Sequence, residues 1–260
     1  MNKVFQVCSY IKHWLTARYS LGYNVHSPFL YDFTRNVIYE DNLYYCYQAI
    51  ETQRHQLLHN NNTIYVEDYG TGHSKKRKIS DIALTSLAKP KEGQLLFRIA
   101  NAVDAKNILE LGTSLGITTA YLTAHSSKCN TTTLEGSSDI INIAIQNWQK
   151  LHLETQIKSV QGNIDETLPL ILKKDILYDI IYFDANHTYE ATIRYFNQCL
   201  PYKTEKTIFI VDDIYYSPEM NKAWQEIMQY PEVKATIDLY DIGIVFFNPY
   251  FIKKNYKMRW

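Results

Sequence analysis

The sequence predicts an α/β protein built on a doubly wound, mostly parallel sheet, and three observations support this prediction. From residue 104 onward, short β-rich apolar runs alternate with helical patterns. The run ILELGTSLGIT, at positions 108–118, reads as a strand, a glycine turn and the start of a helix. The last two apolar runs are separated only by Asp241, or by 241–243 if the turn is wider, which predicts a hairpin. The sheet should therefore end in an antiparallel edge.

This alternation predicts seven strands with a helix in most of the connections between them. The strands are expected at 107–111, 130–135, 156–161, 178–184, 207–212, 235–240 and 242–248. The helices are expected at 116–125, 138–152, 165–174, 189–200 and 217–229.

The first part of the chain has helical periodicity and no strand alternation. Helices are expected at 3–19, 28–39 and 43–59, and Pro28 after Ser27 is placed as a helix-start proline. Two more helices, at 79–88 and 93–103, lead into the first strand. We therefore expect a helical cap or lid region over 1–78 and a ligand-binding sheet domain over 79–260.

The charge balance limits the classes of partner. Lys and Arg number 27 and Asp and Glu number 27, so no cationic surface for nucleic acid is expected, and the basic cluster at 75–78 is read as a solvated loop. No apolar run reaches the length of a membrane span, and the N-terminus lacks a signal-peptide core. The expectation is a soluble, cytoplasmic protein without a nucleic-acid or membrane partner.

Cysteine and tyrosine usage adds little about chemistry. The four cysteines are scattered without a C-x-x-C, so neither a zinc site nor a disulfide framework is indicated. The 22 tyrosines suit lids, interfaces or an aromatic-lined pocket, and a homodimer is one expectation from them.

The glycine turn after the first strand predicts a nucleotide-type ligand. A second glycine of a G-x-G-x-x-G would stand at Ser114, and no G-K-[ST] for a triphosphate follows. Glu110, two positions before the turn, suits a ligand that carries an ammonium group. The predicted ligand is S-adenosylmethionine (SAM), and the contacting residues are Glu110, Gly112, Thr113, Ser114 and Gly116.

The ends of the next two strands extend this site, because ligands of open α/β sheets lie at the carboxyl ends of the strands. Glu135 lies about 20 residues after the turn, where a carboxylate can accept both ribose hydroxyls. The alternative for Glu135 is a solvated surface glutamate. Gly162, Asn163 and Ile164 follow the third strand and are predicted to lie beside the adenine, although a Gly-Asn turn is also an ordinary strand-to-helix connector.

Three carboxylates follow the fourth and fifth strands, at Asp184, Asp212 and Asp213. Like charges repel unless a cation intervenes, so a hard divalent cation, Mg²⁺ or Ca²⁺, is one prediction. Asp184 is also expected to contact the cofactor and to be catalytic; the alternative is that it binds only the methionine portion of SAM, while Asp212 and Asp213 cap the next helix or face water. His187, three residues after Asp184, is a candidate general base for a substrate hydroxyl.

Residues of about 85 to 248 resemble the class I SAM-dependent methyltransferases, with their Rossmann-like sheet, and within them the catechol and caffeoyl-CoA O-methyltransferases. The resemblance rests on KEGQLLFRIA, ILELGTSLGITTAYL, TTTLEGSS and the aspartates. It implies that Gln94 touches the cofactor and that Asp184, Asp212 and Asp213 bind the metal. Two departures are His187, where catechol O-methyltransferase has a lysine, and the N-terminal region, which resembles uncharacterised O-methyltransferase-like proteins of Bacteroidetes.

The predicted function is transfer of a methyl group from SAM to a hydroxyl of a small-molecule acceptor. A divalent metal would lower the pKa of the acceptor and His187 would take its proton. Two alternatives stay open: a metal-independent methyltransferase in which His187 is the base, and a SAM-binding protein without catalysis. A nucleic-acid or protein methyltransferase is disfavoured by the neutral charge and by DANH, 184–187, where exocyclic amine methylation would need [DN]-P-P-[YF].

Overall fold

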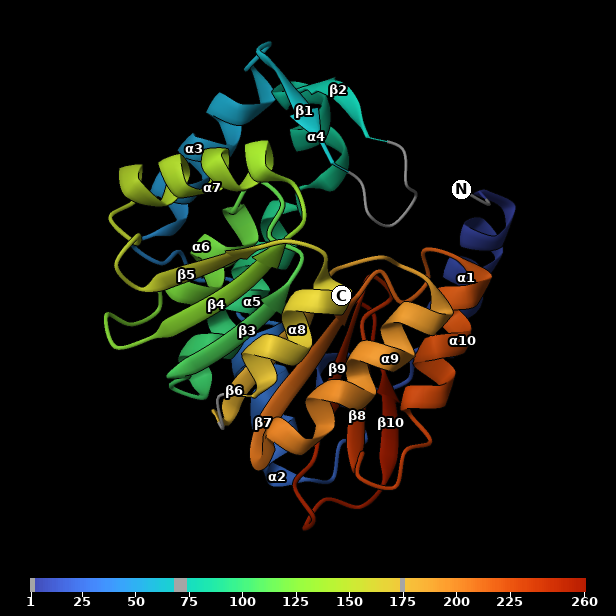
Figure 1. Ribbon diagram of the computed structural model, residues 1–260. Helices are drawn as coiled ribbons and strands as arrows, with labels where there is room; N and C mark the ends of the chain where they lie inside the picture. The colour runs from blue at the N-terminus through green and yellow to red at the C-terminus, as the bar shows by residue number, and fades with distance from the viewer. Residues whose placement is uncertain (1–2, 68–73, 174–175) are drawn as a thin grey trace. The chain divides into compact units, whose positions relative to one another are not determined.

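A computed structural model describes residues 3–67, 74–173 and 176–260 (Figure 1). The chain folds into two compact units. The central unit is formed by residues 42–176, and the C-terminal unit is formed by residues 1–41 together with 177–260. The predicted boundary at residue 78 stays a prediction.

The central unit contains three parallel strands, β3 (Asn107–Leu111), β4 (Asn130–Glu135) and β5 (Ile157–Gln161), which lie side by side in Figure 1. The register pairs Glu110 with Thr133 and Glu135 with Gln161. The helices and the outlying hairpin of this unit are α3 (Tyr47–Leu58), β1 (Thr63–Val66), β2 (Lys75–Lys78), α4 (Ile79–Ser86), α5 (Pro90–Ala102), α6 (Ile117–Thr123), α7 (Ser138–Lys150) and α8 (Ile164–Leu172).

The antiparallel pair of β1 and β2 was not predicted. The basic cluster expected in a solvated loop forms β2 itself, where Lys75, Lys76 and Lys78 remain exposed. This segment is a strand because its backbone pairs with Thr63–Val66, and the local sequence does not show that pairing. The prediction of a loop was therefore wrong, whereas solvation of the lysines was right.

The C-terminal unit contains five strands in the order β10-β8-β9-β7-β6. β6 pairs parallel with β7, whereas β9 pairs antiparallel with both β7 and β8, so the predicted antiparallel hairpin is confirmed. The strands are β6 (Tyr178–Phe183), β7 (Lys203–Asp212), β8 (Ala235–Asp238), β9 (Ile242–Phe246) and β10 (Lys254–Lys257). The helices are α1 (Lys3–Thr16), η1 (Ser20–Gly22), α2 (Pro28–Phe33), η2 (Thr34–Ile38), α9 (Tyr189–Cys199), η3 (Leu200–Tyr202) and α10 (Pro218–Ile227).

The predicted α/β class with a mostly parallel sheet is confirmed, with changes at the ends of elements. All seven predicted strands are present, and β10 is an additional strand that pairs parallel with β8. The predicted helix at 28–39 begins at Pro28 as expected, with the Ser27 side chain accepting a hydrogen bond from the Leu30 amide, and changes into a π-helical turn at Thr34. Within the described ranges, no helix combines the length and the apolar content that a membrane crossing would need.

A buried ion pair attaches α1 to the strands of the C-terminal unit. His13 Nε2 lies 2.9 Å from Asp238 Oδ1, and each of the two side chains is only 4% exposed. The Tyr215 hydroxyl donates to Asp238 Oδ2 at 2.9 Å, and the Tyr240 amide donates to Oδ1 at 3.0 Å. Lys257 Nζ lies 3.8 Å from Oδ2. Asp238, at the end of β8, is thus approached by side chains from α1, from the segment before α10, and from β10.

Candidate functional site

The glycine turn after β3 is a loop with three residues in the left-handed region. Gly112, Ser114 and Gly116 have φ angles of 99°, 48° and 79°. The Gly112 amide donates to the Leu134 carbonyl at 3.0 Å, and the hydroxyls of Thr113 and Thr133 lie 2.6 Å apart. The loop is therefore fixed to the end of β4, and its backbone is shaped before any ligand binds.

Gly116 is required by packing. A Cβ atom at this position would lie 2.6 Å from Trp148 Nε1 and 2.9 Å from the Ala144 Cβ. The indole Nε1 of Trp148 donates to the Gly116 carbonyl at 2.8 Å. The second glycine of the motif therefore allows α7 to pack closely against the start of α6, as the last glycine does in dinucleotide-binding loops.

Glu135, the last residue of β4, holds the glycine loop from the other side. Its Oε2 accepts from the Ser114 amide at 2.9 Å and its Oε1 accepts from the Ser137 amide at 3.0 Å. Burial raises the pKa of this carboxyl, and the surrounding backbone amides oppose that rise. Because a carboxylate can accept about four hydrogen bonds, capacity for ligand hydroxyls remains. The alternative of a solvated surface glutamate does not describe this partly buried, doubly bonded group.

The turn after β5 adjoins Glu135 through the backbone. Gly162, with a φ of 134°, donates its amide to the Glu135 carbonyl at 2.9 Å. The Asn163 side chain accepts from the Asp165 amide at 3.1 Å and thus caps α8, in which Ile164 is the first residue and is buried. Asn163 therefore performs the connector role that the sequence left open. The turn lies next to the proposed ribose carboxylate, and its adenine contact stays a prediction.

Glu110 is fully buried beneath the loop. Its Oε2 accepts from the Thr119 hydroxyl at 2.5 Å and from the Thr133 hydroxyl at 2.6 Å. Its Oε1 is buried and has no hydrogen-bond partner among the described residues. Burial raises the pKa of Glu110 to about 8, so the carboxyl is mostly protonated at neutral pH. An unpaired oxygen at this depth costs free energy unless a donor reaches it.

Glu110 should make stability depend on pH in a defined direction. Its pKa in the folded protein is about 8 against an ordinary value of 4.5, so its contribution is complete below 4.5 and is lost as pH rises through 8. Without ligand, the wild type should lose roughly 2 to 4 kcal/mol of unfolding free energy between pH 5 and pH 9 from this group. In urea titrations Glu110→Gln should flatten this dependence, whereas Glu166→Gln, at an exposed position, should not. Parallel profiles for all three proteins would contradict the assignment.

Gln94 lies in α5, the helix expected to touch the cofactor, and is partly buried. Its carbonyl accepts from the Tyr47 hydroxyl at 3.2 Å. The neighbouring Gly93 allows Tyr121 to pack on this helix, since an added Cβ would lie 2.4 Å from the ring. The structure thus fixes the backbone at Gln94, while its contact with a ligand stays a prediction.

In the C-terminal unit, three of the four predicted rim residues come together after β6 and β7. His187 Nε2 lies 3.4 Å from Asp184 Oδ1, and His187 Nδ1 lies 3.9 Å from Asp213 Oδ2. Burial lowers the pKa of His187, and the negative charge of Asp213 partly opposes this effect. The imidazole is therefore mostly neutral at pH 7 and can accept a proton.

The loops that carry this cluster have unusual backbone conformations. Asn186, His187 and Asp213 have φ angles of 61°, 25° and 54°, which are uncommon for residues with a Cβ. The Asn186 side chain donates to the Tyr195 hydroxyl at 2.6 Å and so helps to hold its loop. Such conformations cost about 1 to 3 kcal/mol each and are found preferentially at functional sites.

Binding of a metal by Asp184, Asp212 and Asp213 stays a prediction. Across the described ranges, no three His, Cys, Asp or Glu side chains are grouped so that they could hold a metal ion. His187 instead lies between Asp184 and Asp213. Capping of α10 by the aspartates is also not observed, because the Ser217 side chain accepts from the Met220 amide at 3.1 Å. Asp212, at the end of β7, is partly buried.

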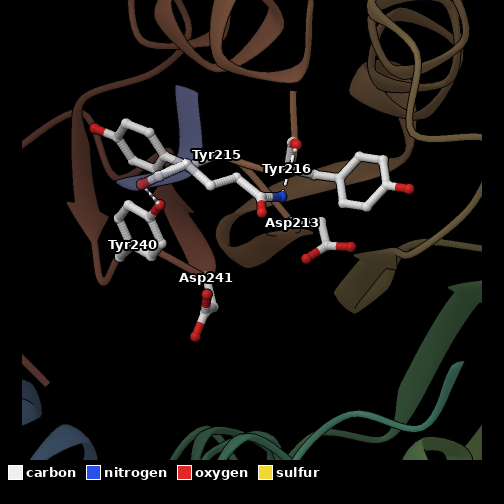
Figure 2. A pocket seen from close by; sticks show the side chains of 6 residues that line it. Asp213, Tyr215, Tyr216, Tyr240 and Asp241 are labelled. Atoms are coloured by element: carbon white, nitrogen blue, oxygen red, sulfur yellow. Dashed lines mark hydrogen bonds between the residues drawn. The ribbon is translucent and has the colours of Figure 1, made fainter. Parts of the chain in front are cut away.

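A pocket of about 180 Å³ adjoins Asp213 (Figure 2). Its lining residues are Gln6, Asp213, Tyr215, Tyr216, Tyr240 and Asp241. The Gln6 amide donates to the Tyr216 carbonyl at 3.0 Å, and the Tyr240 hydroxyl donates to the Gln6 carbonyl at 2.7 Å. Figure 2 shows Tyr215 and Tyr240 against each other, stacked with ring centroids 4.8 Å apart. The Tyr216 ring lies 5.6 Å from the His187 ring, which places the candidate base beside this pocket.

Sequence reasoning did not identify this pocket. The signal available was the pair Tyr215-Tyr216 directly after the fifth predicted strand, within a chain rich in tyrosine. Nothing in the sequence indicated Gln6, which comes from the other end of the chain, or Tyr240, which has a φ of 78° in the turn between β8 and β9.

Comparison with known proteins bears on the fold and on the domain family. Residues 109–214 match the model of a methyltransferase domain family. A comparison with curated proteins found no match. Among solved structures, an O-methyltransferase from Bacillus cereus in complex with S-adenosylhomocysteine (SAH) is 24% identical with a TM-score of 0.55, over 62% of this chain and 83% of that one.

Two further structures are similar at lower identity. A caffeoyl-CoA O-methyltransferase-like protein from Staphylococcus aureus is 20% identical with a TM-score of 0.57, over 64% of this chain and 88% of that one. An O-methyltransferase of tomaymycin synthesis from Streptomyces achromogenes, in complex with SAM, is 16% identical with a TM-score of 0.56, over 62% and 82%. Residues 109–214 of this chain are therefore similar to a methyltransferase domain, and the chain has the α/β fold of these O-methyltransferases.

Proposed function

We propose that this protein transfers a methyl group from SAM to a hydroxyl oxygen of a small molecule. The observation that carries the proposal is the Glu135 carboxylate, which holds the Ser114 amide of the glycine loop at 2.9 Å within the matched domain. This arrangement presents an acceptor for ribose hydroxyls beside a loop that a nucleoside can approach. The similar proteins from Bacillus cereus and Streptomyces achromogenes hold SAH and SAM.

The residues of the central unit fit the parts of the cofactor. Glu135 would accept hydrogen bonds from both ribose hydroxyls, since its carboxylate retains capacity beside the Ser114 and Ser137 amides. Loss of the Glu110 proton on ligand binding would free its buried Oε1 to accept from the ammonium group. The loop residues and the turn after β5 complete the proposed site, namely Gly112, Thr113, Ser114, Gly116, Gly162, Asn163, Ile164 and, from α5, Gln94.

The C-terminal unit provides the base. SAM supplies a methyl group activated by a sulfonium leaving group, so the protein must orient the acceptor oxygen and remove its proton. His187, held mostly neutral by burial, takes that proton. Asp184, 3.4 Å from His187 Nε2, and Asp213, 3.9 Å from Nδ1, stabilise the imidazolium that forms. The pocket of Tyr215, Tyr216 and Tyr240 would hold an aromatic or similarly flat acceptor.

The proposed mechanism needs no metal step, because His187 removes the acceptor proton. The earlier prediction of Mg²⁺ is therefore an outcome to be tested, with chelation as the direct measurement. A cytoplasmic location is also proposed, and it is consistent with four cysteines of which none forms a disulfide in the described part of the chain.

The test is methyl transfer from radiolabelled SAM across a panel of phenols and alcohols, with and without EDTA. We expect a methylated product and SAH, with the rate unchanged by the chelator because His187 suffices as base. Glu135→Ala should weaken SAH binding roughly 10- to 100-fold, since the carboxylate is a charged acceptor, whereas Glu166→Ala should not.

Three outcomes would redirect the assignment. Activity that is lost with EDTA and restored by Mg²⁺ would support the metal route. SAH binding without transfer to any acceptor would support a catalytically silent binding protein. Equal SAH binding by Glu135→Ala and wild type would contradict the proposed cofactor site.

A further inference from the structure

We propose that a second cavity in the C-terminal unit, between α1 and α10, is a binding site for a small organic anion. The cavity has a volume of about 550 Å³, which is within the range of ligand sites. Its lining residues are Phe5, Cys8, Ser9, Lys12, His13, Tyr215, Asn221, Gln225 and Lys257. Tyr215 is the one residue that also lines the pocket beside Asp213.

Residues of two helices, α1 and α10, make up most of the lining of the cavity. Phe5, Cys8 and Lys12 recur at helical spacing on α1, and Asn221 and Gln225 are one turn apart on α10. Figure 1 shows α1 and α10 next to each other. Cys8 and Lys12 are exposed, so the space opens to solvent and a ligand can enter it from the surface.

The lining is basic. Lys12, His13 and Lys257 reach the cavity, and none of the described residues that line it is a carboxylate. The nearest carboxylate described above is Asp238, whose Oδ1 is engaged by His13 and the Tyr240 amide and whose Oδ2 is engaged by Tyr215. Asp238 therefore faces into the protein, and two lysine charges stand against its single negative charge. An anion in the cavity would balance the remaining positive charge.

The position of Lys257 supports this inference. Its Nζ donates to the Tyr215 hydroxyl at 3.1 Å and lies 3.8 Å from Asp238 Oδ2, which is too long for a hydrogen bond. An ammonium group has three donors, so Lys257 can donate to a ligand while keeping its contact with Tyr215. Lys12 is exposed on α1 and can approach the same ligand from the solvent side.

The remaining lining defines the ligand class. Phe5 and the Tyr215 ring give apolar surface, and the Asn221 and Gln225 amides give neutral donors and acceptors. This combination suits a phosphate or carboxylate attached to a body of about one ring. A free inorganic ion would leave the apolar wall without a partner, and a cationic ligand would meet the lysines.

Calorimetric titration with matched one-ring probes tests the proposal, with saturating SAH present to occupy the cofactor site. We expect phenyl phosphate to bind with a submillimolar Kd, benzoate to bind more weakly, and benzylamine and benzyl alcohol not to bind. Lys257→Met and Lys12→Met should each weaken phenyl phosphate binding about tenfold, because each removes a charge-assisted hydrogen bond. Lys206→Met, at an exposed lysine of the same unit outside the lining, should bind as wild type does.

Two results would overturn the assignment: equal binding of benzylamine and phenyl phosphate, or phenyl phosphate binding that is unchanged in Lys12→Met. Lys257 also contacts Asp238, so circular dichroism should establish that each variant is folded. If Lys257→Met does not fold, the exposed Lys12 position carries the test alone. The difference between phenyl phosphate and benzoate identifies which anion the site prefers.

Discussion

Replacement of His187 by alanine is expected to lower kcat by roughly 10²- to 10⁴-fold while leaving SAH binding unchanged. The imidazole is the group placed to take the acceptor proton, because burial keeps it mostly neutral and Asp184 and Asp213 flank its two ring nitrogens. The proposed cofactor contacts lie in the central unit, so affinity for SAH should not change. The measurement pairs steady-state methyl transfer with SAH titration on the same preparations.

The pH profile separates a base from a merely structural histidine. In the wild type, kcat should fall as pH drops through the pKa of His187, which is below its ordinary value of 6.5. His187→Ala should lose that acid limb. His55→Ala, at an exposed histidine of α3, serves as the matched control and should keep both the rate and the limb. Activity of His187→Ala within about threefold of wild type would show that another group takes the proton.

Replacement of Asp238 by alanine should destabilise the C-terminal unit by about 3 to 5 kcal/mol. The substitution leaves His13 buried beside unpaired groups, because Asp238 accepts from the Tyr215 hydroxyl and the Tyr240 amide as well as pairing with His13. Removing one partner of a buried ion pair costs far more than the pair contributes net. Urea unfolding monitored by tyrosine and tryptophan fluorescence gives the loss.

A double-mutant cycle identifies the source of that loss. Because His13 and Asp238 contact each other, His13→Ala and Asp238→Ala should be strongly non-additive when combined. Glu232→Ala, an exposed carboxylate of the same unit, should change the unfolding free energy by less than about 0.5 kcal/mol. Additive losses for the pair would mean that the ion pair does not attach α1.

The strands that could be predicted from the sequence are those whose apolar pattern results from burial in the sheet. Runs such as YDIIYF and TIFIVD are apolar because the strands are buried, and their order predicts a parallel sheet whatever the rest of the chain does. β10, with the sequence KNYK, was not predicted because half its residues are charged and its pairing with β8 depends on register. β2, with the sequence KKRK, escaped prediction for the same reason.

The site was predictable where chemistry lies at strand ends and not where it depends on long-range packing. Glu135 and His187 follow strands and could be found from position alone. The contact of Gln6 with Tyr216 joins residues 210 positions apart, and no local pattern encodes it. Glu110 was predicted to suit an ammonium group of the ligand, yet its protonated state at neutral pH depends on burial beneath the loop, which the sequence spacing does not show.

The residues at positions 116 and 148 are expected to covary among related sequences. The indole fills the space that a Cβ at 116 would need and bonds to the carbonyl of the same residue. A relative with a larger residue at position 116 should therefore have a smaller one at position 148. A search that scores the glycines alone will treat both as a nucleotide-binding signature. The second of them, Gly116, is explained by the packing of Trp148 from the neighbouring helix. Scoring the two positions jointly would separate loops of this kind from unrelated glycine turns.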